Sequence, residues 1–223
     1  MSKRVLVVVA HADDEALGCG GTISRHVAEG NTVELVLMTD GVASRTTANK
    51  DILNRRMNAA KQAHSILGIA ESHFLDFPDN AMDSLPLLQI VQRLEPIIQF
   101  VAPSIIYTHF HGDLNIDHRI TQKAVLTACR PQPGCSVKEI YGFEVLSSTE
   151  WASPQAGSFT PNVHVDIMPF FANKIKALKA YSEEMRPAPH TRSLEHAEAL
   201  ALHRGYSVGI KYAEAFVAYR ILR

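Results

Sequence analysis

The chain has little cysteine and no excess of charge of either sign, and these two absences exclude several classes of protein. Its three cysteines include no CxxC pair, whereas disulfide frameworks and thiolate zinc sites need paired or closely spaced cysteines. The net charge is −1, so no overall field attracts nucleic acid or an anionic membrane. The sequence therefore predicts free thiols in a reducing compartment and no nucleic-acid partner.

Long hydrophobic runs are also absent at the N-terminus. The apolar run of residues 5–10 stops after six residues at His11, whereas a membrane span needs about 20 apolar residues and a signal-peptide core about 7–15. We therefore expect a cytoplasmic protein without a membrane span. The composition is otherwise that of an ordinary globular protein, with one tryptophan but eleven histidines. The positions of the histidines must show which of them have a chemical role.

The first two-thirds of the chain alternates strand and helix patterns. Apolar, β-branched runs predict strands at 4–10, 32–39, 73–77, 104–110 and 138–146. Amphipathic segments predict helices at 14–30, 54–69, 85–102 and 117–130, the third with a break or kink at Pro96. This alternation predicts an α/β fold, a Rossmann-like three-layer sandwich with a mostly parallel sheet.

The pattern changes after residue 147. A polar, turn-rich stretch is followed by expected helices at 170–185 and 194–209, separated by a proline-rich loop, and by an expected strand at 213–222. Nothing in the composition marks a second domain. We therefore predict a single α/β domain of residues 1–223, in which 1–146 is the core and 147–223 completes the fold and lines the substrate site.

A histidine and three acids follow the first predicted strand, in the segment "HADDE" at 11–15. In an open α/β sheet, ligands gather at the carboxyl ends of the strands. His11 and Asp14 are three residues apart across a strand-to-helix turn, so their side chains can converge, and Asp13 can face the same cavity. One acid here could simply cap the next helix, but capping leaves the histidine unexplained.

A second cluster, "THFHGDLNIDH" at 108–118, follows the strand expected at 104–110. Two strand ends of one sheet that both carry histidine and aspartate suggest a shared site. Imidazole and carboxylate groups are zinc ligands, and a catalytic zinc site has three protein ligands and one open position. A neighbouring free carboxylate can take a proton from water. The residues therefore favour metal-assisted hydrolysis.

The two clusters together resemble the motifs of the PIG-L/LmbE-like zinc-dependent de-N-acetylases. That family carries AHPDDE after its first strand and a second motif ending in Asp-His, compared with "AHADDEALGCGGTI" and "THFHGDLNIDHR" here. The resemblance covers residue 4 to about 146. It implies an enzyme that removes the acetyl group from an N-acetylglucosamine-like sugar or sugar conjugate. It also implies Zn²⁺ held by His11, Asp14 and His118, with Asp13 as general base.

The chain departs from the family at Asn115, where many members have a histidine that helps to stabilise the transition state. Asn115 could hydrogen-bond the oxyanion but could not donate a proton to the leaving amine, so that role passes to Asp13, His109 or His111. A proline-rich loop folded over the site could present Arg186 and Arg192 to a phosphate or carboxylate. The candidate substrate contacts are Asp40, Arg56, His109, His111, Arg186 and His190.

Four further features of the motifs have two readings each. Asp117 and Asp113 could each hydrogen-bond a zinc-bound histidine or cap the following helix. Glu15 could interact with the helix dipole or orient a ligand such as His11. The segment "GCGG" at 18–21 is not GxGxxG, so we expect its glycines to allow close packing of the helix on the sheet rather than dinucleotide binding.

Two other functions remain open. Two histidines and a carboxylate also form the facial triad of non-haem iron enzymes, and a sugar- or nucleotide-binding module without catalysis would share the fold. Neither of them needs the extra aspartate at position 13. The sequence leaves open whether the chain forms a homo-oligomer.

Overall fold

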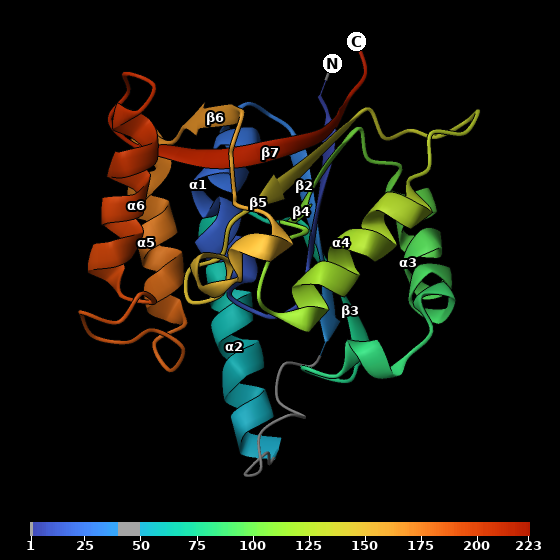
Figure 1. Cartoon of the computed structure of the whole chain (residues 1–223), viewed down its shortest axis with the longest axis horizontal. Helices are drawn as coiled ribbons and strands as arrows, with labels where there is room; N and C mark the ends of the chain where they lie inside the picture. Colours follow the sequence, from blue (N-terminus) through green and yellow to red (C-terminus); the bar gives the residue numbers. More distant parts are fainter. Residues whose placement is uncertain (1, 40–49) are drawn as a thin grey trace.

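A seven-stranded sheet runs through the centre of the molecule, with helices on both of its faces (Figure 1). The computed structural model describes residues 2–39 and 50–223. The strands are β1 (Arg4–Val9), β2 (Thr32–Thr39), β3 (Glu71–Phe77), β4 (Ile105–His109), β5 (Glu139–Phe143), β6 (Val163–Asp166) and β7 (Ala213–Ile221). The α-helices are α1 (Asp14–Ala28), α2 (Lys50–Leu67), α3 (Leu87–Val101), α4 (Ile116–Ala128), α5 (Phe171–Ala180) and α6 (Leu194–Tyr206).

The strand order is β3-β2-β1-β4-β5-β7-β6, and the first five strands in this order are parallel. β7 runs antiparallel to β5, and β6 runs antiparallel to β7. The predicted three-layer α/β sandwich with a mostly parallel sheet is therefore confirmed. The four-residue strand β6 was not predicted from the sequence, because "VHVD" is too short to stand out in a polar stretch.

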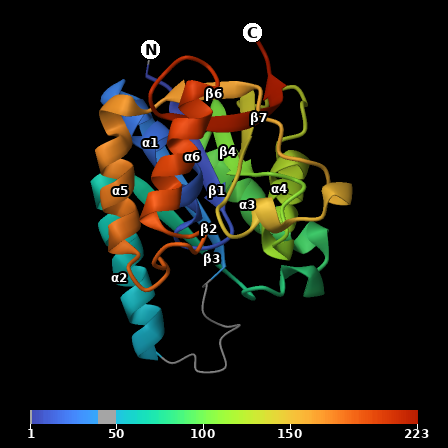
Figure 2. The same cartoon turned by 60° about the vertical axis from the view of Figure 1, so that its left-hand side comes forward.

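The apolar run of β1 is explained by burial on both faces of the sheet. Val5, Val7 and Val9 pack on the side of α1, α2, α5 and α6. Leu6 and Val8 pack on the side of α3 and α4. Figures 1 and 2 show these two helical layers on either side of the strands. No helix in the described ranges has both the length and the apolar character that crossing a bilayer requires.

The strand order reverses between β1 and β4, since β2 lies on one side of β1 and β4 on the other. Crossover connections leave these two strands in opposite directions, which opens a crevice at their carboxyl ends. This edge of the sheet is the lower one in Figure 1. His11 follows β1 and His109 ends β4, so the topology brings the two sequence clusters to the same place.

Two helices differ from the sequence prediction. α3 continues through Pro96 without the break that was one of the two expectations at this residue. Pro96 and Gln92 are both exposed, so the carbonyl that loses its intrahelical donor is open to water and the helix tolerates the proline. In contrast, α1 contains a break at Cys19, which has φ −147° and ψ 23°.

Candidate metal centre and active-site cleft

Three side chains converge at the carboxyl ends of β1 and β4. Asp14 Oδ2 lies 3.3 Å from His11 Nδ1 and 3.3 Å from His118 Nε2, and these two nitrogens are 3.2 Å apart. All three side chains are buried. Two imidazole nitrogens and one carboxylate oxygen within 4.8 Å of one another form a donor set that suits zinc and leaves one position open. The residues present could therefore hold a metal ion.

The turn between β1 and α1 sets the directions of the two aspartates. Asp14 is the first residue of α1, and its Oδ2 accepts the N–H of His11 at 2.8 Å. Asp13 has a φ of 113°, a conformation that costs a non-glycine residue about 1–3 kcal/mol. Its N–H donates to Glu15 Oε2 at 3.1 Å, and Tyr181 Oη donates to the other oxygen of Glu15 at 2.6 Å. Glu15 thus supports the backbone of Asp13.

Each of the two histidines also faces a carboxylate with its other ring nitrogen. His118 Nδ1 lies 3.0 Å from Asp113 Oδ1. Asp113 also accepts hydrogen bonds from the hydroxyls of Ser148 and Thr149. Carboxylates in this position fix the tautomer and the ring orientation of a ligating histidine. Of the two readings of Asp113, the structure shows the contact with the histidine.

The side chain of Asp117 contacts His11 rather than His118, which is its neighbour in sequence. Its Oδ2 lies 3.2 Å from His11 Nε2, which is also 3.2 Å from Asp79 Oδ1. The two oxygens of Asp117 accept the N–H groups of Asn80 and Met82 at 2.6 and 3.0 Å. These backbone contacts join the turn after β3 to the first turn of α4.

Asn115 is the N-cap of α4. Its Oδ1 accepts the N–H of Asp117 at 2.8 Å, and its Nδ2 donates to Asn80 Oδ1 at 3.0 Å. The amide oxygen therefore starts the helix that carries His118, while the NH₂ group hydrogen-bonds Asn80, and both residues line the cleft.

The cleft beside the cluster has a volume of about 180 Å³. Arg192, from the loop between α5 and α6, reaches into it and donates from Nη1 to Asp13 Oδ2 at 2.8 Å and from Nε to Ser147 Oγ at 2.9 Å. Arg56 lies there too, with Nη1 3.6 Å from Glu184 Oε1. The eight residues that line it are His11, Asp13, Arg56, Asp79, Asn80, Asn115, Glu184 and Arg192.

Of the candidate contacts within the described residues, four are not among these eight. His109 is fully buried; its ring stacks on His118 with centroids 3.9 Å apart, and its Nε2 accepts the N–H of Ala10 at 2.9 Å. His111, Arg186 and His190 are exposed, and Arg192 reaches the cleft where Arg186 does not. Asp40 lies outside the described residues.

Asp79, Asn80 and Glu184 line the cleft but were not predicted as site residues. Asp79 and Asn80 belong to "PDN" directly after β3, a sequence typical of a turn. A signal was present, because this turn follows the carboxyl end of a parallel strand. Glu184 follows α5 and gave no comparable signal in the sequence.

The two adjacent aspartates have opposite pKa shifts. Burial raises the pKa of Asp13, although the charge of Arg192 opposes this effect. Burial also acts on Asp14, but His118 and His109 outweigh it and hold the pKa of Asp14 well below its usual range. Pairs of carboxyl groups whose pKa values are pushed apart are suited to different roles. Asp14 therefore holds its proton less tightly than a free carboxyl group does, and Asp13 holds it more tightly.

Comparison with known proteins gives a family match. The family described as PIG-L: GlcNAc-PI de-N-acetylase matches residues 6–129, which include both motifs. YaiS, an uncharacterized deacetylase of Escherichia coli K12, is 31% identical over 185 residues, 80% of this chain and 90% of YaiS. Diacetylchitobiose deacetylase of Thermococcus kodakarensis is 28% identical over 229 residues, 95% of this chain and 81% of the relative.

Solved structures share the fold over nearly the whole chain. N,N'-diacetylchitobiose deacetylase from Pyrococcus horikoshii superposes with a TM-score of 0.79 at 21% identity, covering 98% of this chain and 84% of the other. GalB, the 4-carboxy-2-hydroxymuconate hydratase of Pseudomonas putida KT2440, superposes with a TM-score of 0.78 at 23% identity, covering 99% and 98%. Because a deacetylase and a hydratase share this architecture, the fold alone does not assign the reaction.

Proposed function

Because the chain belongs to the PIG-L family of GlcNAc-PI de-N-acetylases, we propose that it hydrolyses the acetamide of an N-acetylglucosamine-like sugar or sugar conjugate, with Zn²⁺ as cofactor. The observation that carries the proposal is the pairing of a buried His-Asp-His donor set with a second aspartate at the wall of the same cleft. The relative named as a diacetylchitobiose deacetylase supports a sugar substrate.

In this proposal His11, Asp14 and His118 hold the zinc ion. When bound, the ion would polarise the acetyl carbonyl and lower the pKa of the attacking water. The supporting carboxylates Asp113 and Asp117 keep the two rings directed at the ion through the contacts described above.

Asp13 acts as general base and then as general acid. Its carboxylate takes a proton from the water as the water oxygen attacks the acetyl carbon. When the carbon–nitrogen bond breaks, the protonated Asp13 gives that proton to the departing nitrogen. A free amine and acetic acid leave, and the acid, which carries the second proton of the water, loses it to solvent to become acetate. Burial raises the pKa of Asp13, which makes its carboxylate a stronger base toward the attacking water. Asp13 thus supplies the proton that Asn115 cannot donate.

Asn115 and Arg56 are the substrate contacts that we propose from the cleft. The NH₂ group of Asn115 lies at the cleft wall and can donate to the oxygen that becomes negative during attack. Arg56 donates from Nη2 to the carbonyl of Ala12 at 3.3 Å, which places its guanidinium beside the Asp13 turn. From there it can hydrogen-bond sugar hydroxyls.

Acetate release from a panel of N-acetyl sugars tests the proposal. The panel contains N-acetylglucosamine, diacetylchitobiose and N-acetylglucosamine conjugates of malate and inositol, each assayed with added zinc. Wild type should release acetate from at least one of them. Asp13→Asn should lower kcat about 10²–10⁴-fold with zinc still bound. Asp83→Asn, the same chemical change at an exposed residue, is the matched control and should leave kcat unchanged.

Two results would contradict the proposal. Release of acetate from none of the panel by zinc-loaded wild type would remove the deacetylase assignment. Zinc-loaded Asp13→Asn with unimpaired turnover would remove Asp13 from the role of base. Oxygen uptake with bound iron would instead favour the facial-triad enzyme, and sugar binding without turnover would favour the binding module.

A further inference from the structure

Helix α1, which begins at the metal-ligand candidate Asp14, is two half-helices joined at Cys19. The segment "GCGG" at 18–21 forms this junction. A Cβ on Gly18 would overlap the ring of Phe143 in β5, and a Cβ on Gly21 would lie 2.7 Å from Ile167 Cβ. The expectation that these glycines allow close packing on the sheet is confirmed for Gly18. The junction also interrupts the helical hydrogen bonds, which leaves backbone groups that need other partners.

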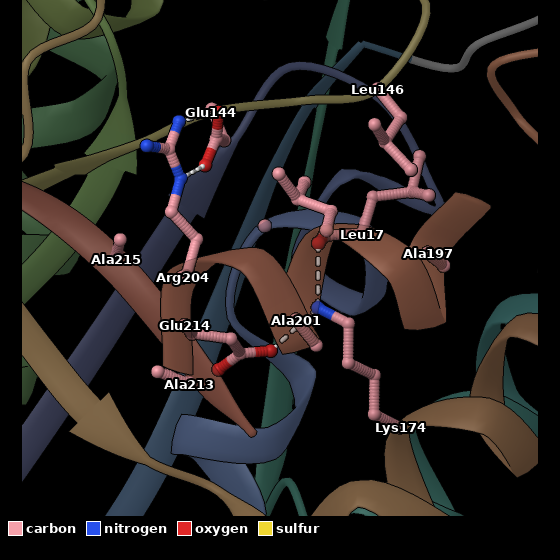
Figure 3. Close-up of a pocket in the computed structure, with 12 residues that line it drawn as sticks. Leu17, Glu144, Leu146, Lys174, Ala197, Ala201, Arg204, Ala213, Glu214 and Ala215 are labelled. Carbon is pink, nitrogen blue, oxygen red and sulfur yellow. Dashed lines mark hydrogen bonds and ion pairs between the residues drawn. The ribbon is translucent and has the colours of Figure 1, made fainter. Parts of the chain in front are cut away.

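Two buried side chains of opposite charge hydrogen-bond to those backbone groups. Figure 3 shows the contacts of Lys174 with the Leu17 carbonyl and with Glu214. Lys174 Nζ donates to the carbonyl of Leu17 at 2.7 Å. Glu214 accepts the N–H of Gly21 at 2.9 Å and both the N–H and the hydroxyl of Thr22 at 2.7 and 2.6 Å. The ammonium and the carboxylate are 2.6 Å apart. One ion pair therefore provides hydrogen-bond partners for backbone groups on both sides of the helix break at Cys19.

The signs of the two charges match the two helix ends that they meet. A helix carries partial negative charge at its C-terminus and partial positive charge at its N-terminus. The ammonium of Lys174 meets the end of the first half-helix, and the carboxylate of Glu214 meets the start of the second. A buried ion pair offsets its desolvation only when further hydrogen bonds satisfy it, and this pair has them on both sides.

The pair is linked to the proposed catalytic turn through one residue, Leu17. Leu17 accepts from Lys174 with its carbonyl, while its N–H donates to the carbonyl of Asp13 at 2.9 Å. The first half-helix therefore lies between the ion pair at one end and the two aspartates at the other. Lys174 comes from α5 and Glu214 from β7, so residues far along the chain hold the start of α1.

We propose that Lys174 and Glu214 are positioning residues for the metal centre: they fix the half-helix of residues 14–18 against the sheet and so hold Asp13 and Asp14 in their working directions. This inference rests on the proposed function for the metal, but its effect on the half-helix is independent of activity. A purely structural ion pair would affect global stability without a specific effect on the metal site.

A second ion pair in the same cavity provides a matched control. Arg204 of α6 donates from Nε and Nη2 to the two oxygens of Glu144, both at 2.8 Å. Figure 3 shows this pair beside Lys174 and Glu214. Within the described part of the chain, neither Arg204 nor Glu144 hydrogen-bonds to α1. Removing this pair removes a charge interaction of the same cavity but leaves the helix break intact.

The experiment compares Lys174→Met with Arg204→Met by two measurements. Zn²⁺ affinity is measured by competition with a chelator, and amide hydrogen exchange of residues 14–22 is measured in protein without added metal. Lys174→Met should weaken zinc binding about tenfold, the low end of the range for residues that support metal ligands. It should also speed exchange in the half-helix. Arg204→Met should leave both within about twofold of wild type, even where its thermal stability falls.

The double variant Lys174→Met/Glu214→Gln separates positioning from stability. It leaves no unpaired buried charge, so its stability should recover relative to Lys174→Met. The Leu17 carbonyl still lacks its donor, so zinc affinity and exchange should remain impaired. This variant also serves if Lys174→Met does not fold.

Equal effects of Lys174→Met and Arg204→Met on both measurements would overturn the proposal, as would zinc affinity that returns together with stability in the double variant. A wild-type protein that binds no zinc would contradict the proposed function instead. In that case the hydrogen-exchange rates of Lys174→Met and Arg204→Met still test whether Lys174 holds the half-helix in place.

Discussion

At the scale of single residues, the surroundings of each histidine decide its charge. The carboxylates of Asp14 and Asp113 outweigh burial and raise the pKa of His118 to about 9. His64 of α2 is also buried, and burial alone lowers its pKa to about 4. Its Nδ1 is 2.9 Å from Ser72 Oγ. Without a bound ion, these shifts favour the charged form of His118 and the neutral form of His64. A metal ion held by His118 would displace its proton.

His64 should make the protein sensitive to mild acid. Its pKa is about 4 in the folded state and about 6.5 in an unfolded chain. Between these values the unfolded state binds a proton that the native state does not. The stabilisation is therefore present above pH 6.5 and is lost as the pH falls toward 4, at about 1.4 kcal/mol per pH unit and about 3 kcal/mol in all.

Urea unfolding at several pH values, compared between wild type and His64→Gln, measures this contribution. Glutamine has no proton to gain, so the free energy of unfolding of the variant should fall less steeply between pH 6.5 and 4.5. Parallel pH profiles for the two proteins would show that His64 does not titrate in this window.

At the scale of helices and strands, the N-termini of α1 and α4 set the directions of the site residues Asp14 and His118. The strands and their polar ends could be predicted from the sequence, because β-branched runs and the acids and histidines that follow them are local signals. The break at Cys19 could not be predicted, since it is held by Lys174 and Glu214 from distant elements. The helical capping role of Asn115 was also missed, because its place in the family motif suggested only catalysis.

Two substitutions separate the helix-capping role of Asn115 from its proposed contact with the reacting oxygen. Asp caps helices about as well as Asn but has no NH₂ group, whereas Ala provides neither. Asn115→Asp should keep the stability of wild type within about 0.5 kcal/mol while kcat/KM falls, and Asn115→Ala should also lose about 1 kcal/mol of stability. Urea unfolding and acetate release provide the two readings. Full activity in Asn115→Asp would exclude the amide as a contact to the reacting oxygen.

At the scale of the whole molecule, residues 147–223 extend the sheet with β6 and β7 and bring Arg192 and Glu184 to the cleft. The contact between Asp13 and Arg192 joins positions 179 residues apart. No local pattern in the sequence encodes such a contact, since it depends on how α5 packs on α1 and α6 on β7. The motifs therefore predicted the centre of the site, while its outer wall required the three-dimensional structure.

X-ray diffraction at the zinc absorption edge, from crystals of the zinc-loaded protein, locates the ion and so tests its proposed ligands. We expect an anomalous peak about 2.0–2.2 Å from one nitrogen of His11, one nitrogen of His118 and one oxygen of Asp14, with Asp13 beside the ion but not bound to it. A peak held by other residues, or an ion coordinated by Asp13 in place of Asp14, would contradict it.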